Sequence, residues 1–376
     1  MNRNKESKLL GMSLIELTTI AEAAGQPSYR AQQLFDGLYR QRVASVEHIS
    51  NLPLNFRHYL SRKGDPVGAP SVDQKFVASD GTVRYLIKFA DGRTVETVWM
   101  PEGDGGEAGD GSEIGNEVQG QSSNCWDRAT ICVSSQVGCA VECRFCMTAL
   151  LGVERNLTAG EIVGQVCAVL NDQKVSVAQS RINIVFMGMG EPFLNFDNFT
   201  KAVRLLVQGI GIPESRMTVS TAGIVPRIYD LGKESVRPKL AISLNASNDP
   251  LRTQLMPINR KWDIQKLLAA ARDFPLRGRE RLTFEYVLLD QVNDTIENAR
   301  ELVELLRGLR AKVNLIALNP GAGIQFGTPN EERVHAFKAV LTAADLPSFI
   351  RRPRGRDIYA ACGQLKRTVE LVQLPA

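Results

Sequence analysis

The chain of 376 residues has no run of 18 or more apolar residues, so the sequence predicts no membrane-spanning helix. Its first residues, MNRNKESKLLGMSLIEL, lack the apolar core and the small-residue cleavage site of a signal peptide. We therefore expect a cytoplasmic protein that does not contact a membrane. Apolar residues make up 44% of the chain, which allows one large hydrophobic core and a smaller domain beside it.

Histidine is scarce, with three residues in the chain, and cysteine is unevenly spread. The seven cysteines are an odd number, and three of them fall within eight residues. This pattern argues against the disulfide framework of a secreted protein. A reducing compartment, in which thiols bind metals or react, fits it better.

Basic residues are absent from segment 102–125, EGDGGEAGDGSEIGNEVQGQSSNC, which has six acidic residues. The segment has too few apolar residues to fold on its own, so the sequence predicts a mobile loop. In the rest of the chain, 45 Lys and Arg residues face 35 Asp and Glu residues. This excess indicates either a polyanionic partner such as nucleic acid or simply a basic enzyme surface.

Residues 1–62 have apolar residues at helical spacing, for example in SLIELTTIAEAAG and YRAQQLFDGLYRQR. We interpret them as a small helical accessory domain, whose arginines either face RNA or are simply solvated. Residues 63–128 form a second region. Within it, 75–100 alternates apolar and polar residues, and Asp80-Gly81 and Asp91-Gly92 mark turns. A hairpin followed by the acidic loop is predicted there.

Residues 129–350 alternate short β-branched runs with amphipathic segments, a pattern typical of a parallel sheet with helices between its strands. A barrel and an open sheet both fit six such repeats. Thr158 and Glu161 form the capping box that starts the first helix. The predicted strands are 129–135, 182–187, 216–220, 239–243, 282–288 and 312–317, and the predicted helices lie near 159–172, 197–208, 263–273, 296–308 and 330–344.

Cys139, Cys143 and Cys146 have the spacing C-x3-C-x2-C on a loop after the first predicted strand. Three thiolates on one short loop suit an iron–sulfur cluster and leave one iron open to a further ligand. Zinc is the alternative. Structural zinc sites need four ligands, however, and none of the three histidines has a ligand-like spacing to these cysteines. A fourth cysteine from elsewhere in the chain would be required.

Polar and glycine-rich residues follow most of the other predicted strands as well. In parallel α/β barrels, chemistry gathers at the carboxyl ends of the strands. We therefore expect one shared site there, although each segment alone would also suit a simple turn. The segments are Met187-Gly188-Met189-Gly190-Glu191-Pro192, Ser220-Thr221-Ala222-Gly223, Ser243-Leu244-Asn245 and Asn319-Pro320-Gly321.

Seven motifs occur along the chain in order: CVSSQVGCAVECRFCMTA, VFMGMGEPFLN, VSTAGIVP, AISLNASND, EYVLLDQVND, NLIALNP and GRDIYAACGQL. They resemble those of the RlmN/Cfr family of radical-SAM RNA adenine methyltransferases, over nearly the whole chain. The resemblance implies an α/β fold, a partial (β/α)6 radical-SAM barrel with a small helical N-terminal domain. It also implies that residues 351–376 are a C-terminal segment that carries a methyl-accepting cysteine.

The resemblance implies a role for each matching residue. Cys139, Cys143 and Cys146 would hold a [4Fe-4S] cluster. Cys362 matches the cysteine that becomes methylated, and Cys132 matches its partner thiol. Glu96 matches a proposed proton acceptor. The pocket for S-adenosylmethionine (SAM) would comprise Gly190, Glu191, Ser220, Ser243, Leu244, Asn245 and Asn319.

Without the resemblance, these residues allow plainer interpretations. Cys132 falls in a predicted strand and would suit a buried core position. Cys362 lies near a predicted helix start, where a thiolate is stabilised, but core packing fits it too. Glu96 alone would be an ordinary strand glutamate. For Cys167, on the apolar side of a helix, we expect a structural role, and Cys125 is interpreted as a spare thiol.

The activity implied by the resemblance is methylation of adenine C2 in 23S rRNA and in tRNA, through an S-methylcysteine intermediate. Its cofactors would be a [4Fe-4S] cluster and SAM, and its electron donor a low-potential flavodoxin or ferredoxin. We expect a monomer. The run Arg351-Arg352-Pro353-Arg354-Gly355-Arg356 would contact RNA phosphates or form a solvated loop. Methylation of adenine C8 and a noncatalytic, metal-stabilised RNA-binding module are the alternatives.

Overall fold

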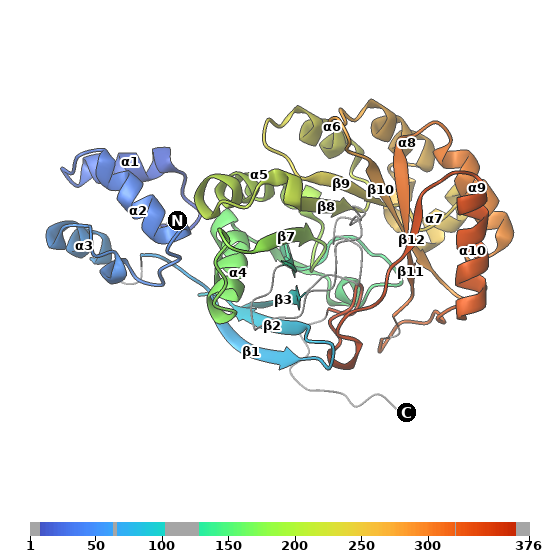
Figure 1. The fold of residues 1–376 in the computed structure, drawn as a ribbon, viewed down its shortest axis with the longest axis horizontal. Coiled ribbons are helices and arrows are strands. Elements are labelled where there is room, and N and C mark those ends of the chain that lie inside the picture. Colours follow the sequence, from blue (N-terminus) through green and yellow to red (C-terminus); the bar gives the residue numbers. More distant parts are fainter. Residues whose placement is uncertain (1–7, 63–65, 102–127, 320, 366–376) are drawn as a thin grey trace.

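A computed structural model describes residues 8–62, 66–101, 128–319 and 321–365. The predicted N-terminal helices are present as α1 (Leu14–Ala23), α2 (Tyr29–Tyr39) and α3 (Leu54–Ser61). Ser13 and Glu16 form a capping box at the start of α1, which satisfies backbone N–H groups that a helix start leaves without a partner. Figure 1 shows the three helices gathered at one end of the molecule, beside a larger α/β body.

The helical end packs closely on α4 (Ala159–Asp172) of the larger body. A side chain at Gly160 would meet the Leu10 carbonyl oxygen at 2.0 Å, so this approach requires glycine. Arg42 donates through Nε to Asn171 at 2.9 Å, and through Nη2 to the Val175 carbonyl at 3.1 Å. The arginines of the N-terminal region were expected to be solvated or to face RNA. Arg42 instead joins this region to the larger body.

The body is built on one sheet of ten strands in the order β1-β2-β3-β4-β7-β8-β9-β10-β11-β12. Each of the six predicted parallel strands is present, with ends shifted by up to three residues, and all six pair in parallel. A short further strand, β12 (Ser348–Ile350), extends the parallel part. The six are β4 (Arg128–Cys132), β7 (Arg181–Phe186), β8 (Met217–Thr221), β9 (Lys239–Ser243), β10 (Leu282–Leu288) and β11 (Ala311–Ala317).

The hairpin predicted over 75–100 is part of a larger antiparallel unit. Its strands are β1 (Ser71–Val77), β2 (Val83–Lys88) and β3 (Thr94–Pro101), and β3 pairs antiparallel with β4. The unit therefore extends the barrel sheet by three strands. Both predicted turns are present, with Gly81 and Gly92 at φ values of 79° and 80°, which favour glycine.

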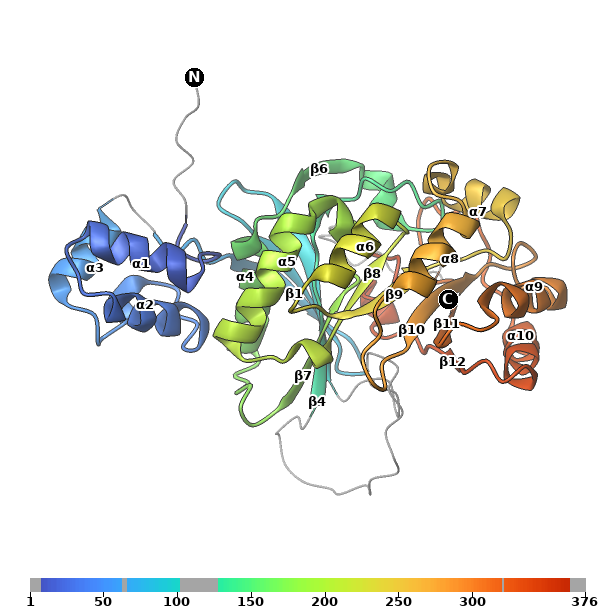
Figure 2. The same ribbon diagram turned by 90° about the horizontal axis from the view of Figure 1, so that it is seen from above.

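Helices cover the outer face of the sheet, as Figure 2 shows. The capping box of Thr158 and Glu161 starts α4 as predicted. Two short helices that the sequence analysis did not predict, α6 and α7, lie between β8 and β10. The helices after α4 are α5 (Phe196–Leu205), α6 (Val225–Lys233), α7 (Asp249–Leu255), α8 (Ile264–Asp273), α9 (Ile296–Leu306) and α10 (Glu331–Ala343).

Some sequence predictions fall outside the described residues. They concern segment 102–125 with Cys125, Pro320, and the end of the C-terminal segment from residue 366 onward. Within the described residues, none of the helices has the length and apolar character needed to cross a membrane.

Candidate functional site

Cys139, Cys143 and Cys146 line one cavity of about 180 Å³, here called the three-cysteine cavity. Their loop follows the small hairpin strand β5 (Gln136–Gly138), whose partner is β6 (Val153–Asn156). Gly138 has φ 81°, and a side chain there would meet the Gly152 carbonyl at 1.8 Å. The hairpin can close only with glycine at this position, and closure turns the loop with its cysteines toward the barrel.

The environment of these thiols is compatible with a metal cluster. Burial raises the pKa of Cys139 to about 12 and the pKa of Cys143 well above its ordinary value, so the free thiols hold their protons. Metal binding would displace those protons. Among the residues that the structure describes, no three His, Cys, Asp or Glu side chains surround one ion position. In a [4Fe-4S] cluster each thiolate binds a different iron, so one shared ion position is not needed.

Gly190 and Glu191, which follow β7, line the same cavity. The Glu191 carboxylate accepts hydrogen bonds from the backbone N–H groups of Ala222, at 2.7 Å, and Phe193, at 3.0 Å. Burial raises the pKa of Glu191 to about 7, although these hydrogen bonds act in the opposite direction. The carboxylate thus joins the ends of β7 and β8 at the cavity wall.

A row of polar side chains crosses the inner face of the barrel. The Ser220 and Ser243 hydroxyls lie 3.2 Å apart, and Glu285 on β10 is the register partner of both Ser243 and Asn314. Asn314 donates to Glu285 Oε1 at 3.0 Å. Glu285 and Asn314 were not among the residues predicted from the sequence. The available signal for Glu285 was one charged residue within the mostly apolar strand LTFEYVL.

The segment after β9 contributes two residues in different ways. Asn245, at φ 58°, lines the three-cysteine cavity and accepts a hydrogen bond from Val287 N at 2.9 Å. Leu244 is fully buried in the hydrophobic core instead. Its carbonyl accepts a hydrogen bond from Arg252 at 3.1 Å, so its contribution to a ligand site would come from the backbone.

Cys362 lies between two cavities. It lines the three-cysteine cavity and also a second one of about 110 Å³, called the arginine cavity because Arg351, Arg352 and Arg354 line it. Asn319 lines both cavities too and donates to the Cys362 carbonyl at 3.4 Å. Cys362 is exposed, but the protein around its thiol is dense. Burial and then Glu285 raise its pKa, whereas Arg351 lowers it.

Cys132, at the end of β4, lines the arginine cavity together with Cys362. It is buried, and burial followed by the charge of Cys362 raises its pKa. The six described cysteines are free thiols in this structure. Cys167 is buried on α4 in the hydrophobic core, which fits the structural role expected for it.

Glu96 lines neither cavity in this structure. It is completely buried on β3 and forms an ion pair with Arg84 of β2. Val98 and Met100, two and four residues further along the same strand, do line the arginine cavity. Since side chains alternate along a strand, Glu96 shares their face of the sheet.

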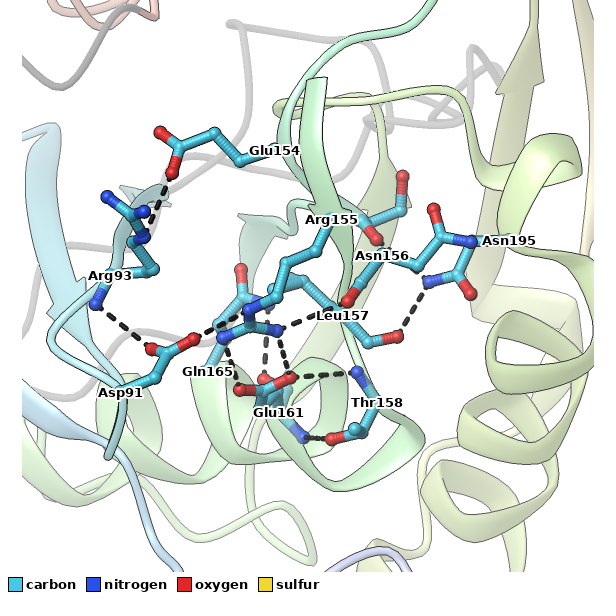
Figure 3. A network of polar contacts seen from close by, with 11 residues as sticks. Asp91, Arg93, Glu154, Arg155, Asn156, Leu157, Thr158, Glu161, Gln165 and Asn195 are labelled. Carbon is cyan, nitrogen blue, oxygen red and sulfur yellow. Dashed lines mark hydrogen bonds and ion pairs between the residues drawn. The ribbon is translucent and has the colours of Figure 1, made fainter. Parts of the chain in front are cut away.

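A network of polar contacts holds β6, the strand that follows the cysteine loop in the chain (Figure 3). Arg155 on β6 pairs with Asp91 in the turn between β2 and β3, at 2.7 Å, and with Glu161 at the start of α4, at 2.8 Å. The Glu161 carboxylate also accepts from Thr158 N at 2.8 Å. The strand that leaves the cysteine loop is therefore held from two sides.

A parallel partial barrel with three cysteines after its first strand defines a radical SAM protein, and a model of the radical SAM superfamily matches residues 133–306. The structure is similar to the crystal structure of a radical SAM methyltransferase from Sphaerobacter thermophilus. The TM-score is 0.85 and the identity 41%, with 96% of this chain and 99% of that chain covered.

Curated relatives show which family of radical SAM proteins the chain resembles. The chain is 65% identical to a probable dual-specificity RNA methyltransferase RlmN from Koribacter versatilis, over 94% of this chain and 99% of that protein. It is 44% identical to the dual-specificity RNA methyltransferase RlmN of Syntrophobacter fumaroxidans, over 94% of this chain and 96% of that protein. The chain therefore belongs to the RlmN family of radical SAM methyltransferases. Radical SAM enzymes use a [4Fe-4S] cluster and SAM, so the predicted fold, cofactors and enzyme class are confirmed, and the noncatalytic alternative is wrong.

Proposed function

We propose that the protein methylates C2 of a specific adenine in 23S rRNA and in tRNA, through a methyl group carried on Cys362. The observation that carries the proposal is the position of Cys362, which lines both the three-cysteine cavity and the arginine cavity. A residue in that position can receive a methyl group on one side and present it on the other. The names of the curated relatives, dual-specificity RNA methyltransferases, support RNA as the substrate.

The chemistry of the target explains why a cysteine must carry the methyl group. C2 of adenine lies between two ring nitrogens and has no lone pair, so it cannot attack the sulfonium methyl of SAM directly. The Cys362 thiolate can do so: a new Sγ–CH3 bond forms while the methyl–sulfonium bond breaks. When bound by Cys139, Cys143 and Cys146, the cluster would supply the electron that splits a second SAM into methionine and a 5′-deoxyadenosyl radical.

The polar strand ends would hold SAM for both reactions. Gly190, Glu191, Ser220, Ser243, Asn245 and Asn319 line the three-cysteine cavity, and the Leu244 backbone lies beside them. The 5′-deoxyadenosyl radical would take a hydrogen atom from the methyl group on Cys362, which would yield 5′-deoxyadenosine and leave a carbon radical on the protein. Its addition to adenine C2 joins RNA to Cys362 through one methylene group.

Two further residues of the chain would complete the reaction. A base removes the C2 proton, for which Glu96 is our candidate, and Arg84 would have to release its carboxylate first. Cys132 would then attack Cys362 Sγ, so that an S–S bond forms while the bond from Sγ to the methylene carbon breaks. The released carbon would take up a proton to become the methyl group of the RNA, and the unpaired electron left from the radical addition would pass to the oxidised cluster. Both cysteines line the arginine cavity, and their free thiols correspond to the reduced enzyme. External reductant must restore them after each turnover.

The surroundings of Cys362 support RNA binding on the arginine side. Arg351, Arg352 and Arg354 would contact phosphates while the target adenine leaves its stack to reach the methyl group. We further propose residues 1–62 as an accessory RNA-binding domain, followed by the hairpin with the acidic Gly-rich loop (63–128), the barrel (129–350) and the segment carrying the methylated cysteine (351–376). A flavodoxin or ferredoxin donor, a monomeric state and a cytoplasmic location stay predictions from the sequence.

Nucleoside analysis tests the proposed reaction. RNA treated with the reconstituted enzyme, SAM and reductant is digested and analysed by mass spectrometry against 2-methyladenosine and 8-methyladenosine standards. The expected product is 2-methyladenosine, from both 23S rRNA and tRNA. Appearance of 8-methyladenosine alone would support the C8 alternative instead.

A further inference from the structure

The segment that carries Cys362 connects the two edges of the partial barrel. It leaves β12, which is the last strand of the sheet, and reaches the turn between β1 and β2 at the first. Figure 1 shows this segment, in dark red, beside the end of β1. The turn and the segment are 275 residues apart in the sequence. Their contact therefore spans the side of the barrel that its strands leave open.

Two carboxylates make the contact reciprocal. Asp80 of the turn accepts a hydrogen bond from Gly355 N at 3.1 Å, and Asp357 of the segment accepts one from Ser79 N at 2.9 Å. Arg354 adds a donation to the Pro101 carbonyl at 2.8 Å, and its Nε lies 3.6 Å from Asp80. Each partner thus supplies a carboxylate to the backbone of the other.

A hydrogen bond within the turn and a close approach at Gly355 define the geometry of the contact. Asp80 Oδ1 accepts a hydrogen bond from Thr82 N at 2.9 Å within its own turn. Gly355 has φ 59°, and a side chain there would come within 2.7 Å of the Ala360 Cβ and 3.0 Å of Thr82. Although burial opposes it, hydrogen bonding to Thr82 and Gly355 lowers the pKa of Asp80, which keeps the carboxylate charged.

The other end of the segment is attached to the cysteine loop. Met147 N donates to the Gly363 carbonyl at 2.8 Å, and Thr148 Oγ1 donates to the Leu365 carbonyl at 2.5 Å. Cys362 is therefore held between two attachments. One is the residue after Cys146, and the other is the turn between β1 and β2.

We propose that this turn is a positioning element for Cys362, with Asp80 and Asp357 as its positioning residues. Its role in catalysis rests on the proposed function, in which the Cys362 thiol receives a methyl group in one cavity and presents it in the other. Without the contact with the turn, the segment near Cys362 keeps its hydrogen bonds at Gly363 and Leu365 and the longer one from Asn319 to the Cys362 carbonyl, and the thiol moves between more positions. The chemistry at Cys362 then becomes less efficient even though the cysteine loop is unchanged.

Alkylation of Cys362 tests the contact without RNA or SAM. Cluster-loaded protein is treated with iodoacetamide, and the modification of Cys362 is followed by peptide mass spectrometry. Among the other described cysteines, Cys132 and Cys167 are buried, and the cluster would occupy Cys139, Cys143 and Cys146. Peptide mass spectrometry separates Cys362 from Cys125, which lies outside the described residues. We expect Asp80→Ala and Asp357→Ala to raise the rate about tenfold, the effect of losing one charge-assisted hydrogen bond.

Asp263→Ala is the matched control. Asp263 likewise supplies a carboxylate to a backbone N–H group, because it accepts a hydrogen bond from Lys266 N at 2.8 Å at the start of α8. None of its hydrogen-bond or ion-pair partners among the described residues lies on the Cys362 segment or on the cysteine loop. We expect its alkylation rate to equal that of the unmodified chain. Equal rates for all four proteins, or an equal rise in the Asp263 variant, would refute the proposal.

A second measurement separates positioning from loss of folded protein. The ratio of 5′-deoxyadenosine released to RNA methylated should rise in the Asp80 and Asp357 variants, because radicals form without reaching the methyl group. A smaller amount of folded enzyme would lower both products and leave their ratio unchanged. Asp80→Asn keeps one amide oxygen, so its alkylation rate should lie between those of Asp80→Ala and the unmodified chain. The alkylation assay uses neither RNA nor SAM, so it tests the contact with the turn independently of the proposed function.

Discussion

Replacing Arg252 with methionine would test how the strand ends around the three-cysteine cavity are held together. The guanidinium is completely buried and donates to the carbonyl groups of Ala222, Ser243 and Leu244, at 2.7 to 3.1 Å. It also donates to Asn259 Oδ1 at 2.8 Å. Burial lowers the pKa of Arg252 to about 10, so desolvation offsets part of what these hydrogen bonds contribute.

The expected loss of stability follows from the acceptors left behind. Methionine has a similar reach but donates nothing, so three backbone carbonyls and the Asn259 side-chain oxygen lose a donor, the Ser243 carbonyl in a half-buried position and the others buried. A buried acceptor without a donor costs roughly 1–3 kcal/mol, and the relief of burying a charge offsets part of the total. We expect the free energy of unfolding to fall by about 3–5 kcal/mol. SAM should also bind more weakly, since Ser243 and Ala222 line the cavity.

Urea unfolding followed by circular dichroism measures the first effect, and equilibrium dialysis with labelled SAM measures the second. Arg272→Met is the control, because Arg272 is exposed on α8 and its loss should change stability by about 0.5 kcal/mol or less. The reasoning is refuted if the Arg252 variant loses no more stability than this control.

Further predictions concern the reactive thiols. Cys362→Ala should prevent methylation of the protein by labelled SAM, measured on the intact protein; label on the variant would assign the methyl group to another residue. Cys132→Ala should leave RNA covalently attached through Cys362, seen as a slow band on a denaturing gel, and free methylated RNA at the normal rate would contradict its resolving role. Glu285→Gln should lower the pKa of Cys362, because the carboxylate raises it, so the pH profile of Cys362 alkylation should shift to lower pH. An unshifted profile would mean that Glu285 does not act on this thiol.

Local sequence patterns were sufficient for most of the fold. Each parallel strand is a short β-branched run between helical segments, and the signal of the capping box at Thr158 is contained within four residues. The strand β1 was predicted only in part, because most of its side chains are exposed or half-exposed and its alternation is weak. Two short helices, α6 and α7, were missed for a similar reason: seven to nine residues carry little periodicity.

The site was predictable only where motif residues line its cavities directly. The three cysteines, Cys132 and Cys362 all do. Glu285 was missed because its sequence signal, one charged residue in a mostly apolar strand, does not tell whether the side chain is buried or solvated. The contact between Asp80 and Gly355 could not be predicted from the sequence for another reason. Asp-Gly signals a turn, but what else its carboxylate binds depends on the register of a sheet formed by distant segments.

The open barrel and the crossing segment have a common physical basis. A closed barrel pairs its last strand with its first, whereas here β1 and β12 are the ends of the sheet order. A folded RNA is too large to enter a closed barrel, so an open side would suit such a substrate. Ser220 and Glu285 lie on paired strands, which fix their positions. Cys362 lies on the segment after β12, at the open side, where no described strand fixes its position. An open side for the substrate and a fixed position for Cys362 are therefore opposing requirements. The antiparallel strands meet both. They line the arginine cavity through Val98 and Met100, and they provide the turn that holds the Cys362 segment.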